Sequence, residues 1–118
     1  GADPAIITTS EALAAGDFVN IHSSAGAKVR KADATTAGKE AHGFVLAGAA
    51  SAASATVYFE GPNTAVSGQT PGVVFLQTTA GTAGTTAPSA AGNIVQKLGV
   101  ATSATSINFE RGEQIVLA

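Results

Sequence analysis

The sequence predicts a small all-β protein, either an antiparallel β-barrel or a β-sandwich of short strands. Three observations support this class. The apolar runs are short and rich in β-branched and aromatic residues, several of them alternate with polar residues, and Gly, Asn, Ser or Pro bounds nearly every run. Many short strands separated by turns are typical of sandwiches and small barrels.

Nine segments have this character. Two of them, 17–22 and 106–110, alternate so that one side of the strand is apolar and the other largely polar, as a half-buried antiparallel strand requires. Phe18 is the exception, because its position in the alternation places it with Asn20 and His22. In chain order the predicted strands are 5–9, 17–22, 28–31, 43–47, 56–60, 72–77, 93–100, 106–110 and 114–117.

One segment, 10–15, is a candidate for helix. Ser10 is a good N-cap and Glu11 to Ala15 have high helix propensity, but Gly16 ends any helix there. We therefore expect at most one short helical turn.

The chain has 118 residues, the size of one domain. Ala, Gly, Ser and Thr make up more than half of it, so the large apolar side chains can build only a thin core. Its net charge is only −2, whereas disordered chains combine few large apolar residues with high net charge. We expect one folded domain over residues 11–118, preceded by residues 1–10. Low charge also favours packing against other copies or a partner.

The two halves of the domain resemble each other, which suggests an internal repeat of residues 16–61 and 72–112. The alternative is that hairpins in any β protein use similar turns. In a repeat, the small-residue stretch 80–92 would be a surface loop equivalent to 25–38, not a linker between domains. The aligned segments are 16–26 with 72–81, 42–47 with 98–101, and 55–61 with 105–112.

The sequence offers little for metal binding. It contains no cysteine, and its two imidazoles belong to His22 and His42. Together with nearby carboxylates they could supply two nitrogen ligands and one oxygen ligand, but their spacing matches no known metal site. We interpret them as strand and turn residues and expect no metal or other cofactor. The carboxylates considered are Asp17, Asp33, Glu40 and Glu60.

Nor does the sequence indicate an enzyme. There is no Gly-x-Ser-x-Gly elbow, and Ser67 and Ser89 lie in loops where their hydroxyls would cap turns. Glu60 and Glu110 end equivalent strands, like the paired acids of a glycosidase, but the chain has no Trp and one Tyr to line a sugar cleft. Gly81 begins a glycine-rich segment that lacks the Gly-Lys-Ser/Thr ending of a phosphate loop. We expect no catalytic site.

Nucleic acid and membrane are also unexpected partners. Lys and Arg number six, and their only cluster is 28–31, so a nucleic-acid surface has little charge to use. No apolar run approaches the about 20 residues that span a bilayer.

Four segments resemble small structural proteins of tailed-phage virions. They are Ala-Gly-Asp-Phe-Val-Asn-Ile at 15–21, Val-Arg-Lys-Ala-Asp-Ala at 29–34, Ala-His-Gly-Phe-Val-Leu-Ala at 41–47 and Ala-Thr-Val-Tyr-Phe-Glu-Gly at 55–61. The chain is most similar to the lambda-type capsid decoration, or cement, proteins, which share its small size, its lack of cysteine and its Ala-, Gly- and Thr-rich β domain. The resemblance covers most of residues 15–118.

The resemblance implies a compact β domain, usually trimeric, that binds the major capsid protein on the outside of the shell and ties neighbouring capsomers together. It implies a location on the virion exterior after a soluble stage in the host cytoplasm. In lambda-type members an N-terminal arm adds a strand to the capsid lattice. The matching candidates by position are Ala5, Ile6, Ile7, Thr8 and Thr9, an extended segment able to donate backbone hydrogen bonds to a sheet edge. The alternative is that they form the first strand of the domain.

A tail fibre is the alternative setting, because small-residue β domains also occur in phage tail proteins. There the domain would bind a receptor or a glycan, and exposed aromatic side chains at its loops would favour that function. All six aromatic residues fall within predicted strands or at their ends, where we expect most of them to be core. They are Phe18, Phe44, Tyr58, Phe59, Phe75 and Phe109.

Overall fold

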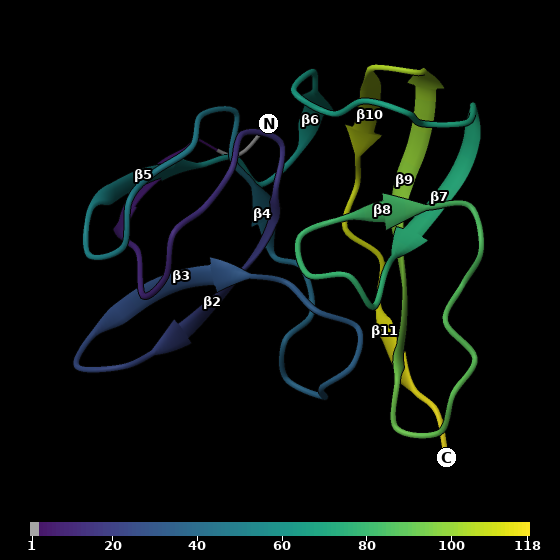
Figure 1. Ribbon diagram of the computed structural model, residues 1–118, viewed down its shortest axis with the longest axis horizontal. Coiled ribbons are helices and arrows are strands. Elements are labelled where there is room, and N and C mark those ends of the chain that lie inside the picture. Colours follow the sequence, from purple (N-terminus) through teal and green to yellow (C-terminus); the bar gives the residue numbers. More distant parts are fainter. Residues whose placement is uncertain (1–2) are drawn as a thin grey trace.

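The structure, a computed structural model, describes residues 3–118, and this part of the chain contains eleven strands and no helix (Figure 1). The strands are β1 (Ala5–Thr8), β2 (Phe18–Ser23), β3 (Ala27–Lys31), β4 (Gly43–Phe44), β5 (Ser54–Val57), β6 (Gly61–Asn63), β7 (Gly72–Leu76), β8 (Ala83–Gly84), β9 (Ile94–Ser103), β10 (Ser106–Phe109) and β11 (Gln114–Val116).

The all-β prediction is confirmed, and the sheets form a sandwich-like stack without closing into a barrel. A strand overlaps each of the nine predicted segments, and β6 and β8 are additional. β6 was not predicted because this strand contains Pro62, and proline is compatible only with an edge strand or a strand end. Indeed β6 pairs with β10 alone.

The helical turn considered for 10–15 does not form. Leu13 instead exchanges two backbone hydrogen bonds with Ala49, at 2.8 and 2.9 Å, and its side chain is buried. The Ala14 amide donates to the Asp17 carboxylate at 2.8 Å. Burying Leu13 against the neighbouring loop therefore outweighs the weak helix propensity of this short segment.

The strands form three antiparallel sheets. The middle sheet has the order β3-β2-β4, and the pair β1-β5 lies on one side of it. The C-terminal sheet has the order β6-β10-β9-β7-β8, with β11 also paired to β9. In Figure 1 the N-terminal strands occupy the left of the view and the C-terminal sheet the right.

Two apolar cores separate these sheets. The central core joins the middle sheet to the C-terminal sheet and includes Phe18, Phe44 and Phe109. The Phe109 ring centroid lies 5.6 Å from that of Phe18 and 5.7 Å from that of Phe44, distances typical of favourable aromatic pairs. The N-terminal core lies between the middle sheet and β1-β5, and includes Val19 and Val57.

This arrangement explains the exceptional position of Phe18. Because the middle sheet has a core on each side, Phe18 and Val19 are both fully buried although they point to opposite faces of β2. Asn20 is buried as well, and its side-chain amide donates to the Gly38 and Glu40 carbonyls at 2.9 and 2.8 Å. Of the six aromatic residues, three are fully buried and the other three are partly exposed.

The strand pairing of the two halves follows one pattern. In the first half Val19 lies opposite Gly43, and in the second Val74 lies opposite Gly99. The residue after each of these glycines has a partner on both sides. Phe44 lies opposite Phe18 on one side and Tyr58 on the other. In the same way, Val100 lies opposite Val73 and Asn108. The row Phe18–Phe44–Tyr58 is therefore equivalent to the row Val73–Val100–Asn108.

The two glycines of this pattern have the same environment. A Cβ atom on Gly43 would lie 2.5 Å from the Tyr58 carbonyl oxygen, and one on Gly99 would collide with the equivalent oxygen of Asn108. Each glycine allows the neighbouring strand to approach closely.

The loop that contains 79–92 is anchored to the domain. Gly81 is buried, its amide donates to the Ala32 carbonyl at 2.7 Å, and its carbonyl accepts from the Phe18 amide at 3.0 Å. Ala83 and Gly84 form β8 against the end of β7.

Candidate functional site

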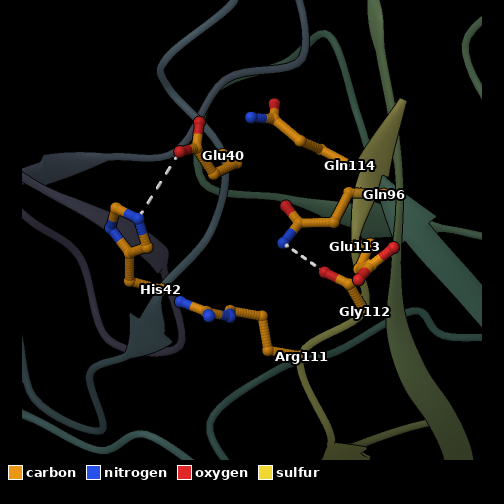
Figure 2. A pocket seen from close by; sticks show the side chains of 7 residues that line it. All are labelled: Glu40, His42, Gln96, Arg111, Gly112, Glu113 and Gln114. Atoms are coloured by element: carbon orange, nitrogen blue, oxygen red, sulfur yellow. Dashed lines mark hydrogen bonds and ion pairs between the residues drawn. The ribbon is translucent and has the colours of Figure 1, made fainter. Parts of the chain in front are cut away.

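An open cleft of about 400 Å³ lies where the loop before β4 meets the C-terminal sheet. The loop contributes Glu40 and His42, and the opposite wall comes from β9, β11 and the connection between β10 and β11 (Figure 2). The residues that line the cleft are Glu40, His42, Gln96, Arg111, Gly112, Glu113 and Gln114.

Gln96 joins the two walls at the base of the cleft. Its side chain is almost completely buried, so its amide needs hydrogen-bond partners. The Oε1 atom accepts from the Ala41 amide at 2.8 Å, while Nε2 donates to the Ala41 carbonyl at 2.9 Å and to the Gly112 carbonyl at 3.2 Å. The Gln96 side chain thus bonds the Ala41 backbone as a neighbouring strand would, and so links the first half of the domain to the second.

His42 has one nitrogen committed to the backbone. Its Nδ1 accepts a hydrogen bond from the Ile21 amide at 2.9 Å, so the neutral ring carries its proton on Nε2. That Nε2 lies 3.6 Å from the Oε1 atom of Glu40. Burial lowers the pKa of His42, and Arg111 adds to this effect, while Glu40 opposes it. The folded state therefore favours the neutral form of the ring.

Glu40 has one buried carboxylate oxygen at the cleft. Its Oε2 atom is buried and has no hydrogen-bond partner among the described residues. In Figure 2 the Glu40 carboxylate lies beside His42, and the Arg111 guanidinium also points toward His42.

These groups suit hydrogen bonding better than proton transfer. Protonation of His42 would place a hydrogen on Nδ1, where the Ile21 amide already donates, so the imidazole is a poor general base. The side chains that line the cleft include no Ser, Thr, Cys or Lys to act as a nucleophile. The cleft can hold a polar group between Glu40 and Arg111.

The candidate arm residues lie within the fold. Ala5 to Thr8 form β1, whose four residues pair with β5 in an antiparallel register from Ala5 opposite Val57 to Thr8 opposite Ser54. Ile7 packs against the N-terminal core, whereas the Ile6 side chain is 76% exposed.

Thr9 closes this strand. Its hydroxyl donates to the Ala50 carbonyl at 2.7 Å and accepts from the Ala53 amide at 3.2 Å, and the residue is buried. Thr9 also forms a parallel bridge with Val29. In the isolated chain the segment is therefore a first strand that is fixed at its end.

One edge of β1 is partly open. Among the described residues, β5 is the strand that pairs with β1 along its whole length. On the other side, β3 lies alongside β1 and is joined to it by the parallel bridge between Thr9 and Val29, which leaves the Ala5–Ile6 end of the edge without a bridge. An unpaired strand edge is a template for a further strand.

The residues considered for metal binding do not assemble into a site. Within residues 3–118, no group of three or more His, Cys, Asp or Glu side chains could hold a metal ion. His22 instead lies 2.8 Å from the Ser10 hydroxyl at the surface, and Asp17 caps the Ala14 amide. No helix in this part of the chain is long and apolar enough to cross a membrane.

Sequence reasoning named Glu40 and His42 but missed Gln96 and Arg111. Gln96 stands at a buried position of a strand that otherwise alternates apolar residues, and this polar interruption is the signal that could have identified it. Arg111 follows β10 in a turn and carries no such signal.

Comparisons with known proteins found no family model, curated protein or solved structure that matches the chain.

Proposed function

We propose that this protein is a non-enzymatic structural protein of a phage virion, which binds the outer surface of the capsid as an oligomer and stabilises the shell. The proposal starts from the resemblance of segments 15–21, 29–34, 41–47 and 55–61 to capsid decoration proteins. Its partners are the major capsid protein and other copies of the chain, and the resemblance favours a trimer.

The open edge of β1 is the observation that carries the proposal. At the Ala5–Ile6 end, no strand of the described residues is bridged to this edge, and Ile6 has the largest exposed fraction of any large apolar side chain in residues 3–118. A strand of the capsid protein that added to this edge would gain backbone hydrogen bonds and cover Ile6.

Stabilisation would follow from mass action. A protein that binds the assembled shell but not its separated subunits raises the free energy needed to disassemble the shell. Because many copies bind one shell, each contact can be weak and the total effect still large.

The test uses shells assembled from the major capsid protein of the same phage. The wild-type protein should co-sediment with these shells and raise the temperature at which they open. Ile6→Asp should weaken co-sedimentation because it places a charge beside the open edge, whereas Val116→Asp, at an exposed position of β11, should not. Absence of wild-type binding to intact shells would refute the proposal.

A tail-fibre domain that binds a receptor or glycan is the second candidate. The polar cleft favours it, because Glu40 and Arg111 offer an acceptor and a donor for sugar hydroxyls. This candidate predicts binding to host cells rather than to shells, and loss of that binding in Glu40→Gln with Ile6→Asp unaffected.

A further inference from the structure

The outward side of the C-terminal sheet carries apolar side chains from three neighbouring strands. We call it the outer face, and its apolar members are Val73 and Phe75 of β7, Val95 and Val100 of β9, and Ile115 of β11. Their place on one side follows from the pairing, since Val73 lies opposite Val100 and Ile115 lies opposite Val95, while the alternate residues of β7 and β9 are buried.

These side chains are accessible to solvent. Val73 is 42% exposed, Val100 is 40% exposed and Ile115 is 64% exposed, so three of the five exposed large apolar residues in the described chain share this face. The row continues through Asn108 to Pro62, both exposed and uncharged. A clustered apolar patch of this kind marks an interaction surface more often than scattered apolar residues do.

The pairing pattern of the two halves indicates what kind of surface covers such a face. The equivalent row in the first half, Phe18–Phe44–Tyr58, lies in the central core beneath the C-terminal sheet, and Phe18 and Phe44 are buried. In the second half the equivalent row has no sheet over it. The middle sheet is thus covered by the C-terminal sheet, whereas the outer face of the C-terminal sheet is uncovered.

The opposite end of the stack is more polar. There the outward side of the pair β1-β5 carries Thr8, Ser54 and Thr56 beside Ile6. That side is a poor match for the apolar outer face of a second copy. The better match is the outer face itself, which gives a pair of copies with the same surface on both sides of the contact.

Charge on the outer face is compatible with such a pair. Lys97, Glu110 and Arg111 line one shallow hollow beside Val100, where Gly99 contributes no side chain. The face therefore carries charges of both signs at this point. In a face-to-face pair, Lys97 of each copy can approach Glu110 of the other, so the contact is complementary to itself.

The area predicts a weak contact. Eight residues of β9 at about 3.3 Å each, across four strands about 4.8 Å apart, cover roughly 400 to 500 Å² on each copy. The total is below the roughly 1,200 Å² of a standard stable interface. Association is therefore expected at high protein concentration or where many copies are held close together.

From these observations we infer that the outer face is a self-association site, through which two copies of this chain pair face to face. The inference goes beyond the proposed function and does not depend on it.

Sedimentation velocity of the whole chain tests the inference, at concentrations from about 10 μM to about 1 mM, the range in which a contact of this size should dissociate. The weight-average sedimentation coefficient should rise with concentration. Val100→Asp should weaken association by at least about tenfold, because it buries a charge at the centre of the contact. Val116→Asp makes the same chemical change on β11 at a position that does not share the outer face, and should associate like the wild type.

A charge exchange provides the second measurement. Lys97→Glu should weaken association because it places two acids together across the contact, and the double variant Lys97→Glu, Glu110→Lys should restore it. A wild-type sedimentation coefficient that stays constant over the whole range would overturn the inference. So would association that Val100→Asp leaves intact. Both outcomes are independent of whether the protein binds shells.

Discussion

Alanine at Gly43 and Gly99 should reveal how closely the paired strands approach in each half. Gly43 has ordinary backbone angles, so Gly43→Ala introduces only a steric conflict with the Tyr58 carbonyl oxygen at 2.5 Å. Overpacking of this kind costs about 1–3 kcal/mol, and we expect the upper end because the obstacle is backbone. Gly99 has φ of +132° in addition to its conflict with Asn108, so Gly99→Ala should cost more.

Gly38 separates the two effects. Its φ is +94°, but a Cβ atom there would meet nothing within 4 Å, so Gly38→Ala should cost only the backbone strain of about 1–2 kcal/mol. Gly99→Ala should then cost about 3–5 kcal/mol, the sum of strain and overpacking. Urea unfolding followed by far-ultraviolet circular dichroism measures these differences in a chain without Trp. The reasoning fails if Gly43→Ala is harmless, or if Gly99→Ala costs no more than Gly38→Ala.

Three further changes test the buried groups. Gln96→Leu should lower the free energy of unfolding by about 2–4 kcal/mol in urea, because it leaves the buried Ala41 amide and carbonyl without partners. Phe44→Ala should cost about 3–5 kcal/mol in the same assay by opening a cavity in the central core. Since the folded state lowers the pKa of His42, its contribution to stability should be complete above about pH 6.5 and should fall as the pH drops below that value. Unfolding midpoints measured from pH 7.5 to about pH 5 check this direction, and His42→Gln should reduce the slope.

Matched variants sharpen these tests. Gln114→Leu changes an exposed glutamine of the same cleft and should stay within about 0.5 kcal/mol of the wild type. If it costs as much as Gln96→Leu, the hydrogen bonds to Ala41 are not the reason. A residual slope is expected in His42→Gln, because burial and Arg30 also lower the pKa of His22. Stability that rises on acidification from pH 7 to pH 5 would contradict the role given to His42.

Local pattern was sufficient to predict the fold class. Short β-branched runs bounded by turn residues produced the nine predicted strands because each of these signals depends on neighbouring residues alone. The helical turn considered at 10–15 does not form for the opposite reason, since Leu13 is held by Ala49, which lies far away in the sequence. Phe18 looked misplaced because a period of two assumes one buried face, whereas β2 has two.

The cleft could not be predicted from local sequence patterns. Glu40 and Arg111 come from segments 71 positions apart in sequence, and only the stacking of the two halves brings them to one site. Gln96 could have been noticed as a polar residue in an apolar strand, but its partner, the backbone of Ala41, leaves no trace in side-chain chemistry. Hydrogen bonds to the backbone are therefore the part of a site that sequence reveals least.

The position of β1 also decides how a capsid arm could work. Release of this strand would break its pairing with β5, uncover Ile7 and remove both hydrogen bonds of the Thr9 hydroxyl. Burying one large aliphatic side chain contributes about 1.5–3 kcal/mol, and each hydrogen bond about 1 kcal/mol, so release would consume a large part of the stability of a small domain. Addition of a capsid strand to the open edge requires none of this loss. Deleting residues 1–10 would therefore damage the fold itself, whereas Ile6→Asp changes the edge and leaves β1 in place.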